Sequence, residues 1–271
     1  MQIQSGLPGI SGVKNIIAVA SGKGGVGKST VAVNLALALV AQGFRAGILD
    51  ADIYGPSQPL MLGVHQHPET QDQKLIPIVK YGLQSMSIGY LVDETTPMVW
   101  RGPMVSRALQ QLLQDTKWDN LDYLVVDLPP GTGDIQLTLA QKIPVNGAVI
   151  VTTPQDLALL DARRAIEMFQ KVRVPVLGVV ENMSVHVCTQ CGHSEAIFGS
   201  GGGESIAQQY GVELLGQLPL ARSIREQTDQ GTPPVVAEPD GDIAKSYGAI
   251  AQEVVQRLKK LTSKFPKIVV E

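Results

Sequence analysis

Cysteine is scarce in this sequence: Cys188 and Cys191 are the two in 271 residues. Two cysteines cannot build the disulfide framework of a small secreted domain. No apolar run approaches the roughly 18 residues that a membrane-spanning helix needs. The N-terminal segment has neither the basic and apolar regions of an export signal nor the Arg-rich pattern of a transit peptide. We therefore expect a cytoplasmic protein.

Charge is also sparse, with 17% charged residues and a formal net charge of -3. Such a balance gives no bulk attraction to nucleic acid or anionic lipid, so we expect neither as a partner. Hydrophobic residues, at 44%, suffice for a sizeable core. Since α/β folds of about 250 residues are routinely single domains, we predict one domain over 1–271, with an N-terminal tail at 1–12.

Short apolar, β-branched runs alternate along the chain with longer helical patterns. The runs predict buried strands at 15–21, 45–52, 83–91, 123–129, 148–154, 176–183 and 213–219. The patterns predict helices at 29–41, 104–113, 157–172 and 204–210. This alternation predicts an α/β fold with a mostly parallel sheet, helices on both faces and ligands at the carboxyl ends of the strands.

Two further segments carry weaker signals. Residues 54–78 are rich in Pro, Gln and His without clear periodicity, and we interpret them as an excursion over the surface. Apolar residues at helical spacing predict a final helix from Asp242 to about Ser263. Its basic end, "RLKKLTSKF", has the composition of a membrane-seeking tail, but last-turn lysines also suit the helix dipole, and we favour a docking helix.

A glycine-rich stretch, "SGKGGVGKST", follows the first predicted strand and opens the first helix. It matches the phosphate-binding pattern G-x-x-x-x-G-K-[ST], in which backbone N–H groups surround phosphates. Lys28 would neutralise the terminal phosphates, and the Ser29 hydroxyl would ligate Mg²⁺. We expect ATP as the ligand. The residues expected to bind it are Gly22, Lys23, Gly24, Gly25, Val26, Gly27, Lys28, Ser29 and Thr30.

Lys23 is a second lysine inside this loop, where the ordinary motif needs none. "GKGGVGKST" is the deviant Walker A signature, and the chain here resembles the P-loop NTPase group that includes MinD, ParA and the nitrogenase iron protein. The resemblance implies that Lys23 reaches the partner's nucleotide across a homodimer. The alternative is a solvated loop lysine. Asn182, at the end of "VLGVVEN", matches the asparagine that contacts adenine in this group.

Acidic residues follow two of the predicted strands. Asp127, after "YLVV", suits a Walker B role that holds Mg²⁺ through water. Asp52 is our candidate for orienting or activating the attacking water. Asp50 either shares this site or turns the end of its strand. The catalytic set is therefore Lys23, Lys28, Asp52 and Asp127.

The stretch "NMSVHVCTQCGHSEAIFGSGGGESIA" surrounds both cysteines. With "WRGPM" at 100–104 and "DLPPGTGD" at 127–134, it resembles the Mrp/ApbC family of iron-sulfur cluster carriers, over about 13–258. The resemblance implies an ATPase that carries a labile cluster and hands it to apo-proteins. The alternative is a MinD/ParA-like positioning ATPase that acts on a membrane or nucleoid partner.

The cysteine loop, 184–203, offers only half of a four-ligand metal site. A two-fold dimer would set Cys188 and Cys191 against a second pair, so that four thiolates complete a bridging 4Fe-4S cluster or hold zinc in its place. Other readings are a redox dithiol, a zinc site within one chain using His186 and His193, and a pair without ligand. We favour the bridged cluster.

Overall fold

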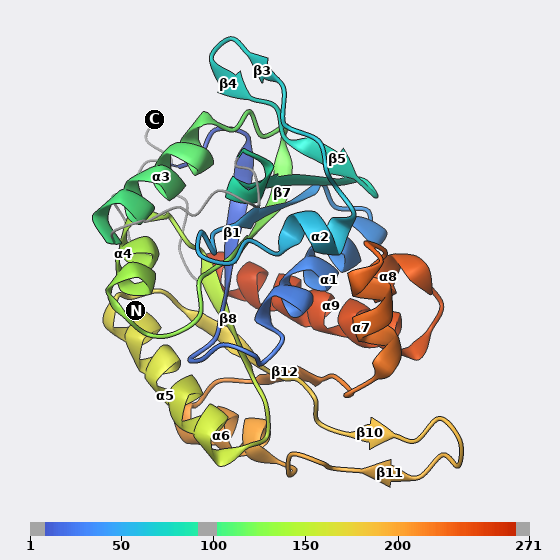
Figure 1. Ribbon diagram of the computed structural model, residues 1–271. Helices are drawn as coiled ribbons and strands as arrows, with labels where there is room; N and C mark the ends of the chain where they lie inside the picture. Colours follow the sequence, from blue (N-terminus) through green and yellow to red (C-terminus); the bar gives the residue numbers. More distant parts are fainter. Residues whose placement is uncertain (1–8, 92–101, 264–271) are drawn as a thin grey trace.

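An eight-stranded sheet in the order β12-β9-β8-β1-β7-β2-β6-β5 forms the centre of the computed structural model, which describes residues 9–91 and 102–263 (Figure 1). Neighbouring strands are parallel, except that β5 and β6 are antiparallel. The strands are β1 (Val13–Ala20), β2 (Ala46–Asp50), β5 (Ile78–Lys80), β6 (Leu83–Ser87), β7 (Leu121–Asp127), β8 (Gly147–Thr152), β9 (Val176–Glu181) and β12 (Leu214–Gln217). The predicted fold class is confirmed, and seven of these strands lie where the apolar runs predicted them.

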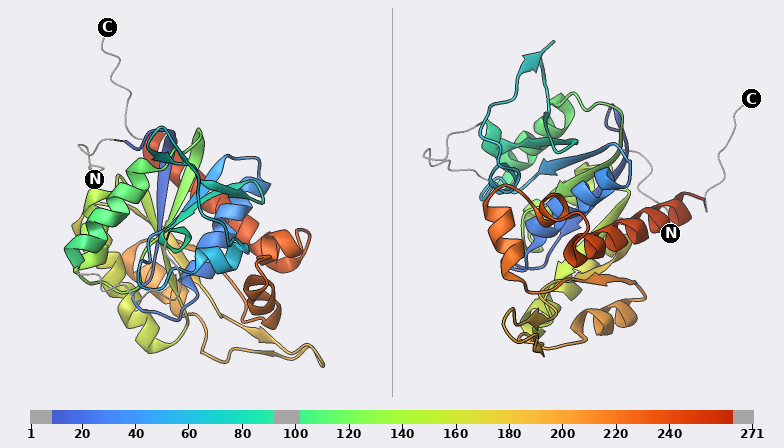
Figure 2. Two further views of the ribbon diagram at one scale, coloured as in Figure 1. Left: turned by 45° about the horizontal axis from the view of Figure 1, so that its top comes forward. Right: turned by 90° about the vertical axis from the view of Figure 1, so that its right-hand side faces the viewer.

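Helices cover both faces of the sheet (Figures 1 and 2). One face carries α1 (Lys28–Ala41), α2 (Gln58–Leu62), α7 (Arg222–Asp229), α8 (Pro234–Ala237) and α9 (Asp242–Ser263). The other carries α3 (Gly102–Asp115), α4 (Asp134–Lys142), α5 (Asp156–Lys171) and α6 (Gly202–Tyr210). A 3₁₀ turn, η1 (Ile88–Tyr90), follows β6, and two small hairpins pair β3 (Thr70–Gln71) with β4 (Lys74–Leu75) and β10 (His186–Val187) with β11 (Ser194–Glu195).

The central strands are mostly apolar because helices cover both of their faces. Side chains from Ile17 to Ala20 are fully buried, as are those from Leu124 to Asp127. Parallel strands of this kind read as continuous β-branched runs, which is why the sequence pattern found them. Each of these strands leads directly to a candidate site residue: β1 is followed by the glycine-rich loop, and β7 ends at the buried carboxylate of Asp127.

The last helix docks on the molecule, as we favoured from its pattern. Tyr247, Ile250, Val254 and Leu258 are buried, and α9 packs along α1. Part of its basic end, from residue 264 on, lies outside the described residues. Within 9–91 and 102–263, no helix combines the length and the apolar character needed to cross a bilayer.

The interpretation of 54–78 as a surface excursion is wrong for part of that segment. Gln58 and Leu62 in α2 are fully buried, Val64 joins the core, and α2 packs against α7. The Pro, Gln and His residues of this segment interrupt any apolar periodicity, so the sequence pattern did not predict the short buried helix α2. Four helices were not predicted, namely α2, α4, α7 and α8. Of the family motif "WRGPM", the first two residues lie outside the described ranges and the rest begin α3.

Candidate nucleotide site and cysteine hairpin

The glycine-rich loop joins β1 to α1 at the carboxyl end of the sheet. Gly25 and Gly27 both have φ of +81°, in the left-handed region that costs glycine little. A Cβ at Gly27 would lie 2.2 Å from Asn182 Nδ2, and one at Gly22 would lie 2.1 Å from the Asp161 carbonyl oxygen. The backbone of α5 thus leaves no room for a side chain at Gly22, and the positive φ together with the Asn182 amide disfavours one at Gly27.

Asn182 fixes the loop from the end of β9. Its buried side chain donates a hydrogen bond from Nδ2 to the Val26 carbonyl oxygen at 2.9 Å, and its backbone N–H donates to the Thr152 carbonyl oxygen at 2.7 Å. The residue predicted to contact adenine thus lies against the P-loop. Within the loop, the Val26 side chain is buried and Gly24 is exposed. At the start of α1, the Thr30 carbonyl oxygen accepts a hydrogen bond from the Asn34 side-chain amide.

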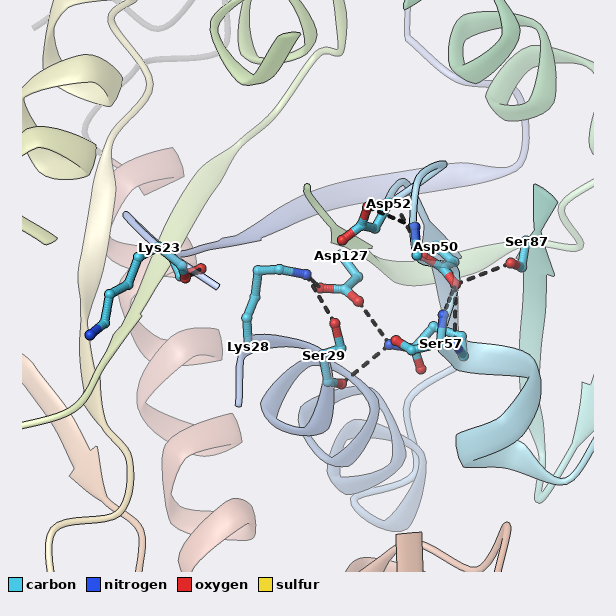
Figure 3. Close-up of polar contacts among 11 residues, drawn as sticks. Lys23, Lys28, Ser29, Asp50, Asp52, Ser57, Ser87 and Asp127 are labelled. Atoms are coloured by element: carbon cyan, nitrogen blue, oxygen red, sulfur yellow. Dashed lines mark hydrogen bonds and ion pairs between the residues drawn. The ribbon is translucent and has the colours of Figure 1, made fainter. Parts of the chain in front are cut away.

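Lys28 and Asp127 form a buried ion pair at the start of α1 (Figure 3). The Lys28 Nζ also donates to the Ser29 hydroxyl at 3.0 Å. The structure therefore brings together three of the residues that the sequence predicted for phosphate and Mg²⁺ binding. A buried charge is costly unless it is paired, so each member of this pair depends on the other.

Gln58 is a site residue that the sequence analysis missed. Its Nε2 donates to Asp127 Oδ2 at 2.9 Å and to the Ser29 carbonyl oxygen at 3.2 Å, while its buried Oε1 has no hydrogen-bond partner within residues 9–91 and 102–263. A lone glutamine in a segment without periodicity carries no signal that separates it from a surface residue. Its importance follows from α2 lying beside the end of β7.

Asp50 stabilises the turn that follows β2. Its carboxylate accepts hydrogen bonds from the backbone N–H groups of Ser57 and Gln58 at 3.0 and 3.1 Å and from the Ser87 hydroxyl at 3.1 Å (Figure 3). Complete burial, followed by the nearby Asp127 charge, raises the pKa of the Asp50 carboxyl to about 7. Of the two roles left open for Asp50, the structure supports the one in which it shapes the strand end.

Asp52 lies at the edge of the same cluster, partly exposed. Burial raises the pKa of its carboxyl, and the Lys28 charge partly offsets that rise. Its Oδ1 accepts a hydrogen bond from the Gly55 N–H at 3.3 Å. A carboxylate in reach of solvent and near the phosphate-binding lysine can accept a proton from water.

Lys23 is not brought into this cluster. Its side chain points away from Lys28 and Asp127 (Figure 3), and the structure gives its ammonium no hydrogen bond or ion pair with any residue in the described ranges. Its backbone carbonyl oxygen accepts the Ser21 hydroxyl at 2.8 Å. The charge of Lys23 is thus directed outward from its own P-loop.

Cys188 and Cys191 lie elsewhere, on the hairpin of β10 and β11 that projects from the body of the molecule (Figures 1 and 2). The Cys188 N–H donates to the His193 carbonyl oxygen, and the Gly192 N–H donates back to the Cys188 carbonyl oxygen, both at 2.9 Å. Gly192 takes a φ of +71° to close the turn. Both thiols are free, and Cys191 is exposed.

The turn itself favours a thiolate at Cys188. Backbone N–H groups of Cys191 and Gln190 point at its sulfur and lower the pKa of the thiol. The amides of this turn thus lower the thiol pKa in the way that a helix N-terminus does in other proteins. A thiolate is the form that binds metal.

Zinc within one chain is not supported by the hairpin. No group of three His, Cys, Asp or Glu side chains in the described part of the chain is placed to hold a metal ion. The His186 ring also makes a hydrogen bond through Nδ1 with the Leu220 carbonyl oxygen at 2.9 Å. In the described part of one chain, the hairpin thus presents two thiols without a third ligand.

These features define a P-loop nucleotide-binding protein. The mostly parallel sheet leads through the glycine-rich loop to Lys28, and Lys28 pairs with the buried Asp127 carboxylate. The chain belongs to the NUBPL iron-transfer family of P-loop NTPases within the ParA group, whose model matches residues 12–255. The family resemblance inferred from its motifs is thereby confirmed.

Named relatives share most of the chain. It is 64% identical to the iron-sulfur cluster carrier protein of Pseudomonas fragi, over 92% of this chain and 88% of that one. It is 62% identical to the carrier of the same name from Escherichia coli K12, over 93% and 69%. It is 55% identical to the iron-sulfur cluster transfer protein NUBPL of Mus musculus, over 92% and 79%.

Solved structures show the same fold. A nucleotide-binding protein from Archaeoglobus fulgidus, in complex with ADP, is 37% identical with a TM-score of 0.76, covering 87% of this chain and 93% of that one. The cell division ATPase MinD of Pyrococcus furiosus is 24% identical with a TM-score of 0.68, covering 89% and 98%. The second likeness concerns the fold alone.

Replacing Lys28 by Ala is expected to weaken ATP binding roughly 10- to 100-fold, because charge-assisted bonds to the terminal phosphates are lost. Isothermal titration calorimetry with Mg-ATP measures this change. Lys14→Ala is the control, since Lys14 pairs with Asp122 on the surface. Unchanged ATP affinity in Lys28→Ala would contradict the assignment of the loop.

Asp50 predicts a pH dependence of stability. Its raised folded-state pKa means that the neutral carboxyl is favoured on folding, so stability falls as pH rises from about 4 to the folded pKa of about 7. In the absence of nucleotide and Mg²⁺, wild-type stability relative to Asp50→Asn should decline between pH 5 and 7, by at most about 1.4 kcal/mol per pH unit, and then level off. Urea unfolding at each pH measures the difference. A difference independent of pH would contradict the assigned pKa.

Proposed function

We propose that two copies of this chain bind and hydrolyse Mg-ATP and together carry a labile 4Fe-4S cluster that they deliver to apo-proteins. The observation that carries the proposal is the projecting hairpin, where Cys188 and Cys191 present two thiols with no third ligand among the described residues. The same chain holds a complete P-loop. The iron-sulfur function in the names of the relatives supports it.

Mg-ATP fits the residues around the P-loop. The loop N–H groups and Lys28 would hold the phosphates, while Ser29 and Asp127 would hold Mg²⁺, Asp127 through water. The unpartnered Gln58 Oε1, buried beside Asp127, is an acceptor suited to such a water. Bound Mg²⁺ would neutralise charge that develops on the phosphate oxygens. Asn182, fixed at the loop, is proposed to contact the adenine.

Hydrolysis is assigned to two further residues. Asp52 is proposed to take the proton of the attacking water, because its carboxyl is partly exposed and lies near Lys28. Lys23 is proposed to stabilise the transition state on the partner's nucleotide, since its ammonium points away from its own site (Figure 3). The outward direction of Lys23 suits a homodimer.

The bridged cluster follows from counting ligands. Four thiolates are what a 4Fe-4S cluster takes from protein, and each chain supplies two. The lowered pKa of Cys188 makes its thiolate available at neutral pH. Zinc bound to the same four thiolates is the competing occupant. Recipients would be apo iron-sulfur proteins in the cytoplasm; we propose neither nucleic acid nor a membrane as a partner. The alternative, a positioning ATPase, has in its favour only the fold shared with MinD.

Cysteine substitution tests the bridged cluster. After anaerobic reconstitution the wild type should hold about four irons and four sulfides per dimer. Cys188→Ala or Cys191→Ala should lose iron, sulfide and cluster-dependent dimerisation as fully as the double variant, because each removes two of the four ligands, while ATP binding persists. Metal and sulfide analysis with light scattering measures this. One metal atom without sulfide would identify zinc, and a cluster retained by a monomer or by either single variant would refute the bridge.

Mixing two inactive variants tests whether Lys23 acts across the dimer. Lys23→Ala and Lys28→Ala should each lose turnover, Lys23→Ala with little loss of ATP binding. A 1:1 mixture should recover about a quarter of wild-type turnover, because half of the dimers are mixed and each mixed dimer holds one intact site. Steady-state phosphate release measures this. No recovery in mixtures shown to exchange subunits would argue that Lys23 acts in cis.

A further inference from the structure

Gln136, in the first turn of α4, has an unusual environment. Its side chain is 2% exposed, and neither Nε2 nor Oε1 has a hydrogen-bond partner among the residues that the structure describes. A buried amide without partners costs free energy, since both its donor and its acceptor have left water. A group from outside the chain, such as a water or a ligand, would satisfy this amide.

The space beside Gln136 is a cavity of about 430 Å³ that opens toward solvent. Its walls include Asp52, Tyr54, Pro129, Pro130 and Gly133. The cavity far exceeds the roughly 30 Å³ that one water occupies, and Asp52, which also lines it, is a polar partner for water. Water therefore has both room and an anchor next to the proposed catalytic carboxylate.

Backbone donors are scarce on the wall formed by the turn after β7. Pro129 and Pro130 have no N–H, and the N–H of Gly131 in the same turn donates to the Ser21 carbonyl oxygen at 3.0 Å. The Gln136 amide is a side chain on this wall that can both donate and accept. A water held between Asp52 and Gln136 would thus have its orientation fixed from two sides.

We propose that Gln136 positions the attacking water for ATP hydrolysis, accepting or donating one hydrogen bond while Asp52 accepts the other. This inference rests on the proposed ATPase function. In the step, the water oxygen bonds to the γ-phosphorus, and the bond from that phosphorus to the β,γ-bridging oxygen breaks. The bond's electron pair leaves with ADP, and the water's proton passes to Asp52. Products are ADP and inorganic phosphate.

Gln136→Met is the decisive variant because it keeps the size of the side chain and removes both polar atoms. Turnover should fall at least about tenfold, with the affinity for Mg-ATP unchanged. Retention of ADP with aluminium fluoride, a transition-state analogue that includes the attacking water, should weaken by a similar factor. The melting temperature should rise by roughly 2–4 °C, since an unpartnered buried amide is gone.

Gln141→Met is the matched control, because Gln141 is exposed on the same helix. It should leave turnover, analogue retention and melting temperature unchanged. Wild-type turnover in Gln136→Met would overturn the inference, and a joint fall of turnover and melting temperature would do the same by assigning Gln136 a structural role. Wild-type turnover no higher than that of Lys28→Ala would instead contradict the ATPase function itself, and this inference with it.

Discussion

The buried ion pair of Lys28 with Asp127 is the interaction on which the nucleotide site depends. Strand register places it: Asp127 pairs with Val19 of β1 on one side and with Asp50 of β2 on the other. Two fully buried carboxylates therefore stand side by side, and Lys28 is the cation that faces them. Two carboxylates at this spacing repel each other and oppose each other's ionisation. Three kinds of group offset that cost: the Lys28 ammonium, the backbone N–H groups that donate to Asp50, and the Gln58 amide that donates to Asp127. Of these groups, Lys28 and Asp127 are the ones that we propose to engage Mg-ATP.

Strand β9 connects this site with the cysteines. At its end, Asn182 holds the P-loop through the Val26 carbonyl oxygen, and Cys188 follows six residues later on the hairpin. The intervening chain is itself anchored, since the Ser184 N–H donates to the Leu218 carbonyl oxygen and the Leu220 N–H donates to that of Val185. One continuous, hydrogen-bonded segment thus runs from the nucleotide loop to the proposed cluster ligands. The two functions are separate in space but joined by a short path of backbone.

Much of this could be read from the sequence because the responsible signals are local. Buried parallel strands are recognised as continuous apolar runs. The P-loop and Cys-x-x-Cys motifs are recognised by the fixed spacing of their residues. Gln58 and Gln136 could not be found in this way. Gln58 is buried against residues far away in the sequence, and Gln136 lines a cavity that Asp52 shares, so no local pattern marks either residue. Each is best recognised by a polar atom left without a partner among the described residues. The short edge strand β5 and the polar helix α7 were not predicted for a related reason, since neither has a long apolar pattern of its own.

The central claim is that this P-loop NTPase delivers an iron-sulfur cluster from the hairpin cysteines. The most direct measurement is anaerobic transfer to an apo-enzyme whose activity requires a 4Fe-4S cluster, in the presence of a chelator that captures free iron. The account predicts that the loaded protein restores activity, up to one recipient per dimer, and that the double cysteine variant treated in the same way restores none. Equal restoration by the cysteine variant, or by iron and sulfide alone under the chelator, would contradict it.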